Sequence, residues 1–167
     1  MRYTPHDYQA YCIDFLLEHP AAGLFLKPGM GKTSIALTAA SQILYDRFEA
    51  SKVLVVAPLR VAEDTWSREG AKWDHLKHLR VCKVLGDAKR RLAALEADAD
   101  LYCINRENVP WLVKHYGSRW PFDLVIIDEL SNFRNPSSKR FRALRKVRPL
   151  IKFLWGLTGT PRPRSLL

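Results

Sequence analysis

The segment LKPGMGKTS, which starts at Leu26, constrains the fold of this chain most strongly. It follows a short apolar run and ends in Gly-Lys-Thr, so we expect a strand, a glycine-rich loop and a helix start in that order. Gly29 and Gly31 permit backbone conformations in which several N–H groups point to one centre. Such a loop is typical of phosphate binding, with Lys32 as the point charge and Thr33 as an oxygen ligand for Mg²⁺. The match is partial, because Leu26 stands where the strict pattern has its first glycine.

The rest of the chain alternates short apolar runs with helical stretches. Runs such as VLVVA and LVII lack polar alternation, as expected for strands that helices cover on both faces. The pattern predicts a single α/β domain over residues 1–167, with a mostly parallel central sheet. Strands are predicted at 23–26, 53–57, 80–84, 101–104, 124–127 and 153–157, and helices at 6–18, 32–46, 60–73, 87–96, 106–116 and 138–147.

Composition limits the class of protein. Hydrophobic residues make up 47% and charged residues 26% of the 167 residues, which is ordinary for a folded domain and argues against disorder. No apolar run approaches the roughly 18 residues of a membrane helix, and the polar start does not resemble a signal peptide. We therefore expect no membrane partner and a cytoplasmic location, or the host cytoplasm if a phage encodes the chain.

The formal net charge of +10 is concentrated near the end of the chain. Residues 130–167 contain ten lysines and arginines and no acidic residue. A localised basic surface indicates a polyanionic partner such as nucleic acid. The alternative is a solvated helix face, since helix 138–147 would bury Phe141 and Leu144 and leave its cations outside.

A pair of acids follows the apolar run in DLVIIDEL. Asp128 and Glu129 should emerge at the carboxyl end of a buried strand, where ligands bind in open α/β sheets. A carboxylate there can hold a hydrated Mg²⁺, and its neighbour can orient or deprotonate an attacking water. We assign the metal to Asp128, with Thr33, and the water to Glu129.

A third motif, LTGTP, follows the last apolar run. Thr158 and Thr160 place hydroxyls on either side of Gly159, where they can touch the region of the acid pair. As a bare string the segment is also compatible with an ordinary turn.

In this order and spacing, GMGKT, IIDEL and LTGTP resemble the first three ATPase motifs of superfamily 2 helicases. Three further segments resemble the Swi/Snf-type branch of DNA translocases, which includes short phage-encoded members. They are YTPHDYQ near the start, the Ala-Pro…Trp segment APLRVAEDTW, and CINRENV. The segment DELSNFRNPSSKRFRAL also resembles the extended second motif of that branch. The resemblance covers nearly the whole chain.

This resemblance implies a RecA-like, ATP-binding first lobe of a DNA-dependent ATPase, acting on duplex DNA in preference to single strands. It implies that Gln9 reads adenine and that Arg60, Asn105 and Arg106 contact a nucleic-acid strand. It further implies that the LTGTP residues Thr158, Gly159 and Thr160 couple the nucleotide to DNA. The residues expected to hold ATP and Mg²⁺ are Gln9, Gly29, Met30, Gly31, Lys32, Thr33, Ser34 and Asp128, with Lys32 and Glu129 as catalytic groups.

The family pattern has a second RecA-like lobe, which supplies an arginine worth on the order of 10³–10⁵ in rate in related phosphoryl transfer. The present sequence matches only the first lobe, so we expect ATP–Mg²⁺ binding but very slow hydrolysis unless a second lobe is supplied in cis or in trans. One alternative is a non-catalytic module that binds nucleic acid or a protein, and another is a small phosphate-loop kinase. Leu130 and Ser131 stand where the family often has Ala-His, which leaves the coupling route open.

Overall fold

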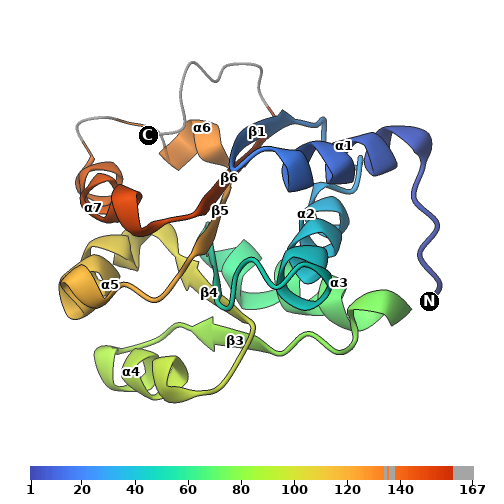
Figure 1. Cartoon of the computed structure of the whole chain (residues 1–167). Helices are drawn as coiled ribbons and strands as arrows, with labels where there is room; N and C mark the ends of the chain where they lie inside the picture. Colours follow the sequence, from blue (N-terminus) through green and yellow to red (C-terminus); the bar gives the residue numbers. More distant parts are fainter. Residues whose placement is uncertain (134, 136–137, 160–167) are drawn as a thin grey trace.

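Six strands form one fully parallel sheet in the order β1-β6-β5-β2-β4-β3, with helices packed on both faces (Figure 1). The computed structural model describes residues 1–133, 135 and 138–159. The predicted α/β fold with a parallel sheet is confirmed. The strands are β1 (Ala21–Phe25), β2 (Val53–Ala57), β3 (Val81–Val84), β4 (Leu101–Asn105), β5 (Leu124–Asp128) and β6 (Phe153–Thr158).

The helices follow the predicted stretches with differences at their ends. They are α1 (Asp7–Glu18), α2 (Lys32–Ser41), α3 (Trp66–Lys72), α4 (Ala88–Glu96), α5 (Val109–Tyr116), α6 (Leu130–Phe133) and α7 (Lys139–Val147). The short helix α6 was not predicted, because one turn after the acid pair is too brief for hydrophobic periodicity to reveal. Among the described helices, none is both long and apolar enough to cross a membrane.

Three predicted helices are subdivided in the structure. Residues 42–46 and 61–65 form π-helical turns, so the predicted helices 32–46 and 60–73 each contain a shorter α-helix. The predicted helix 106–116 begins with a 3₁₀ turn at 106–108, and α5 starts only at Val109. Pro110 lies in the first turn of α5, where its missing N–H costs nothing, and this favours a helix start at that point.

The sheet separates two hydrophobic cores, because neighbouring residues of a strand point to opposite faces. In β2, Val53 and Val55 pack with α1, α2 and α3, whereas Leu54 and Val56 pack with α4, α5, α6 and α7. Figure 1 shows these two groups of helices on opposite sides of the strands. Every residue of β2, β5 and β6 is buried, which explains the near-continuous apolar runs in the sequence.

The strand register brings the ends of distant segments to one edge of the sheet. Phe25 pairs with Thr158, Asp128 pairs with Leu157, and Ala57 pairs with Asn105. Strand β6 lies between β1 and β5, so the loop after β1 and the acids after β5 flank the end of β6. Apart from Gln9, which lies in α1, the residues predicted to carry chemistry therefore stand at or just after strand ends on the same carboxyl edge.

Candidate functional site

The loop after β1 turns sharply at two glycines before α2 begins. Gly29 and Gly31 have φ angles of 86° and 79°, in the left-handed region that glycine adopts without steric strain. Gly31 is the residue before α2, and its carbonyl oxygen accepts the helix's first backbone hydrogen bond, from Ile35 N at 3.0 Å. The N–H groups of the first helical turn have no intrahelical acceptor, so this loop and helix start form an arrangement suited to an anion.

Helix α1 places two side chains over this loop. Gln9 Nε2 donates a hydrogen bond to Met30 O at 3.2 Å, and the Tyr8 hydroxyl donates to the same oxygen at 2.9 Å. A Cβ atom on Gly31 would stand 2.6 Å from Gln9 Nε2, so a side chain at this position would displace the Gln9 amide from the loop. Gln9 and the loop are therefore in direct contact, although the predicted reading of adenine by Gln9 stays a prediction.

Lys32 reaches from the start of α2 to the acid pair after β5. Its Nζ lies 3.1 Å from Asp128 Oδ1 and 2.5 Å from Glu129 Oε1. Burial by itself would lower the pKa of Lys32, but the two carboxylates outweigh it and hold that pKa above its usual value. The ammonium group thus stays charged while it pairs with both carboxylates.

Asp128 is the buried member of the acid pair, with 3% of its surface exposed. Its Oδ2 accepts a hydrogen bond from Trp66 Nε1 at 3.0 Å, while Oδ1 accepts no well-aligned hydrogen bond from the described part of the chain. A buried carboxylate oxygen that has only an ion pair with Lys32 is suited to a cation or its hydration shell. Thr33, at the start of α2, is likewise buried.

The described residues contain no group of three or more histidine, cysteine or acidic side chains that could hold a metal by themselves. Mg²⁺ is usually held by one or two carboxylates together with substrate phosphates and waters, so the sparse set of Thr33 and Asp128 fits that ion.

Glu129 has an unusual backbone conformation for a residue other than glycine. Its φ angle is 59°, in the left-handed region, which costs about 1–2 kcal/mol for a residue with a side chain. Such strained residues cluster at functional sites, because the surrounding structure must hold them in place. The turn at Glu129 separates β5 from α6 and directs the carboxylate back toward Lys32.

The end of β6 lies beside both the loop and the acid pair. The Thr158 hydroxyl donates to Ser131 Oγ at 3.1 Å, and Thr158 O accepts from Leu26 N at 3.0 Å. Ser131 stands where the resembling family often has histidine, so a hydroxyl pair joins the segments after β5 and β6 in this chain. Gly159 lies against Leu26 O and Pro28, and Thr160 lies outside the described residues.

The candidate nucleic-acid contacts lie further along the same edge. Arg60 is exposed three residues after the end of β2, and Asn105 ends the neighbouring strand β4. Asn105 Nδ2 donates to Glu107 Oε1 at 3.3 Å and Arg106 Nε donates to Glu107 Oε2 at 3.2 Å. Glu107 therefore engages two of the three candidates, and the predicted strand contact by all three stays a prediction.

Trp66 was not among the site residues predicted from the sequence. It is fully buried and gives its only N–H to Asp128, so it orients the carboxylate. The position of Trp66 at the end of the Ala-Pro…Trp segment was the sequence feature that could have indicated its role in the site. The partner of its side-chain N–H could not be derived from that segment by itself.

The chain is similar in sequence to known proteins. The family model described as "SNF2-related domain" matches residues 8–167. A curated protein named "Putative protein p41", from Acyrthosiphon pisum secondary endosymbiont phage 1, is 40% identical over 171 residues, covering 99% of this chain and 37% of that protein.

Two solved structures share the fold. The Sulfolobus solfataricus SWI2/SNF2 ATPase core in complex with dsDNA superposes with a TM-score of 0.80 at 23% identity, over 96% of this chain and 33% of that one. The UvsW helicase from Bacteriophage T4 superposes with a TM-score of 0.74 at 19% identity, over 98% of this chain and 55% of that one. The present chain thus spans between a third and about half of the length of these three relatives. The two solved structures share the predicted RecA-like α/β fold with it.

Proposed function

This chain belongs to the SNF2-related domain family of helicase-like ATPases, and on that premise we propose that it is the ATP-binding first lobe of a DNA-dependent ATPase. The observation that carries the proposal is the meeting of Lys32 with Asp128 and Glu129 beside a glycine-rich helix start. Residues 1–167 act as one such domain, and hydrolysis at an appreciable rate requires a second lobe in cis or in trans.

In the proposed mechanism the triphosphate replaces Asp128 and Glu129 as the partner of the Lys32 ammonium group. The β- and γ-phosphate oxygens accept hydrogen bonds from the Lys32 ammonium and from the N–H groups at the start of α2. Gly29, Met30, Gly31 and Ser34 shape the loop around them. Gln9 lies against this loop and contacts the adenine, with Tyr8 beside it.

Thr33 and Asp128 are the residues that would hold Mg²⁺, which when bound would supply charge neutralisation for the phosphate oxygens. Trp66 keeps the Asp128 carboxylate in position through its N–H. Glu129, released from Lys32, orients the attacking water and accepts its proton.

The proposed DNA-binding residues lie at the same carboxyl edge of the sheet. Arg60, Asn105 and Arg106 contact the backbone of a duplex, which gives sequence-independent and salt-sensitive binding. The pair formed by Thr158 and Ser131 passes the state of the nucleotide to that surface, together with Gly159 and Thr160.

The decisive experiment measures the affinity of the chain for a fluorescent ATP analogue in the presence of Mg²⁺. Lys32→Ala should weaken binding by about a hundredfold or more, which corresponds to about 2.8 kcal/mol. The matched control is Lys89→Ala, an exposed lysine on α4. Equal affinities of the wild type and Lys32→Ala would show that the triphosphate does not bind here.

A second measurement separates the ATPase from a non-catalytic module. Turnover should be very slow for this chain with duplex DNA and should rise when a second-lobe protein is added. A chain that binds ATP but gains no turnover under either condition would favour the non-catalytic alternative.

A further inference from the structure

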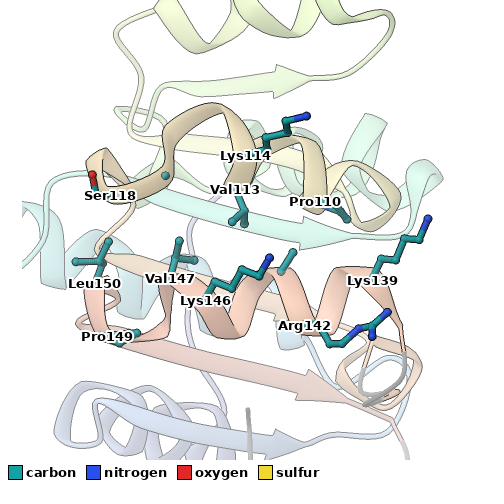
Figure 2. Close-up of a pocket in the computed structure, with 12 residues that line it drawn as sticks. Pro110, Val113, Lys114, Ser118, Lys139, Arg142, Lys146, Val147, Pro149 and Leu150 are labelled. Carbon is teal, nitrogen blue, oxygen red and sulfur yellow. The ribbon is translucent and has the colours of Figure 1, made fainter.

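A groove lies between α5 and α7, on the face of the sheet that α4, α5, α6 and α7 cover. This groove has a volume of about 970 Å³. Figure 2 shows Val113 of α5 and Val147 of α7 pointing toward each other across it, with Lys139 and Leu150 at opposite ends. Its apolar lining consists of Pro110, Val113, Ala143, Val147, Pro149 and Leu150.

The groove exists because α7 divides its apolar side chains between two directions. Phe141 and Leu144 are buried in the core, whereas Ala143 and Val147 also face the groove. Ala143 is small, so it leaves a depression between the two helices. At the end of the groove Leu150 keeps 46% of its surface exposed, which is unusual for a leucine that lines a concave apolar surface.

The charged side chains that line the groove are all basic. They are Lys114 of α5 and Lys139, Arg142 and Lys146 of α7, and among the described residues no acidic side chain lines it. Within the described part of the chain, none of these four cations forms an ion pair. Other cations of α7 are engaged differently, since Arg145 lies over the ring of Phe141, with its guanidinium carbon 6.0 Å from the ring centre.

We propose that this groove binds an amphipathic helix of a partner protein whose apolar stripe is flanked by acidic residues. The apolar lining accepts the stripe, and the four cations pair with the flanking carboxylates. The nine residues of α7 extend about 13–14 Å at 1.5 Å per residue, which matches about two and a half turns of a partner helix.

Charge and apolarity together favour this occupant over a nucleic acid. A phosphate backbone would satisfy the cations but leave the side chains of Val113, Val147 and Leu150 without an apolar partner. The proposal is independent of the nucleotide site, because no residue of the groove contacts the loop after β1 or the acid pair in the hydrogen bonds and ion pairs described above.

The test uses a synthetic fourteen-residue helical peptide with leucine at positions i, i+3, i+4 and i+7 and glutamate at most other positions. A scrambled peptide of the same composition keeps the charge and loses the stripe. Fluorescence anisotropy at low salt should show that the chain binds the patterned peptide at least about tenfold more tightly than the scrambled one.

Two sets of variants locate the binding. Leu150→Asp and the double variant Lys114→Glu with Lys146→Glu should each weaken peptide binding at least about tenfold. The control is Lys83→Glu with Lys89→Glu, which makes the same change in net charge at exposed positions of β3 and α4. All of these variants should retain the ATP affinity of the wild type, so the outcome separates this proposal from the proposed function.

Several outcomes would overturn the proposal. Equal binding of both peptides, or equal peptide affinities for the groove and control variants, would show that the groove takes no acidic helix. Loss of duplex-DNA binding in the Lys114 and Lys146 double variant, without peptide binding by the wild type, would make the groove a nucleic-acid surface. Binding of anionic phosphatidylserine vesicles with no peptide binding would make it a lipid surface.

Discussion

Charged clusters lie at both ends of the sheet, and they are built in opposite ways. At the amino end, Asp100 precedes β4 and its carboxylate accepts hydrogen bonds from Arg80 N, Arg80 Nη2 and the Tyr45 hydroxyl, at 2.8, 3.2 and 2.6 Å. Asp123, which precedes β5, accepts from the backbone N–H groups of Ser51 and Lys52. These carboxylates are saturated with donors and tie the starts of the strands together.

At the carboxyl end, the cluster of Lys32, Asp128 and Glu129 is left incomplete. Asp128 Oδ1 lacks a well-aligned hydrogen bond from the described chain, and Glu129 is held in a strained backbone conformation. In this molecule the carboxylates that stabilise the fold are surrounded by fixed donors, whereas the acid pair suited to a ligand has an oxygen free to accept and a strained backbone.

The largest effect on stability should come from the amino-end cluster. Asp100→Ala removes three hydrogen bonds from a buried carboxylate, including the one from the Arg80 backbone N–H, so the free energy of unfolding should fall by about 2 kcal/mol. Urea unfolding monitored by circular dichroism measures this change. ATP affinity at native conditions should stay within about threefold of the wild type. A strong loss of ATP affinity in the folded variant would show that the amino-end cluster also affects nucleotide binding.

A smaller effect, of opposite sign, is expected at the carboxyl end. Glu129→Gly relieves the left-handed strain, so this variant should be more stable than Glu129→Gln by about 0.5–1 kcal/mol. Glutamine keeps the side-chain length and the strained φ, so it is the matched control for loss of the charge. Both variants should lose hydrolysis in the presence of a second lobe. A glycine variant less stable than the glutamine variant would show that position 129 stores no strain.

The smallest effect is a contrast in pH dependence. Burial alone would raise the pKa of Asp100, but the hydrogen bonds from Arg80 and Tyr45 hold that pKa below its usual value. The stabilisation that Asp100 contributes is therefore complete above about pH 3.9 and is lost as the pH falls through the lower pKa of the folded state. Lys32 has a raised pKa in the fold, so its stabilisation is complete below about pH 10.4 and is lost as pH rises through the folded pKa.

Unfolding curves of the wild type, Asp100→Asn and Lys32→Met across this pH range measure both contributions. The difference between the wild type and Asp100→Asn should shrink as the pH falls into the acid range and stay constant in alkali. The difference between the wild type and Lys32→Met should shrink as the pH rises into the alkaline range. A shared pH dependence of the two differences would mean that the clusters are not independent.

Local patterns in the sequence predicted much of this molecule. The runs VLVVA and LVII became strands within one residue of the predicted limits, because burial on both faces requires uninterrupted apolar residues. The conformation of Gly31 followed from the requirements of a phosphate loop. The positions of Asp128 and Glu129 at a strand end followed from the polar residues that close an apolar run. These are short-range properties, so a single sequence contains them.

Only the tertiary structure decided which of these ends meet. The sequence does not state that β6 lies between β1 and β5, and this neighbour order is what brings Lys32 to Asp128 across the end of the sheet. The bond from Trp66 to Asp128 and the groove between α5 and α7 arise in the same way. Strand order and helix pairing depend on how separate elements pack around a shared buried core. The hydrophobic periodicity within one element does not specify which elements lie beside it.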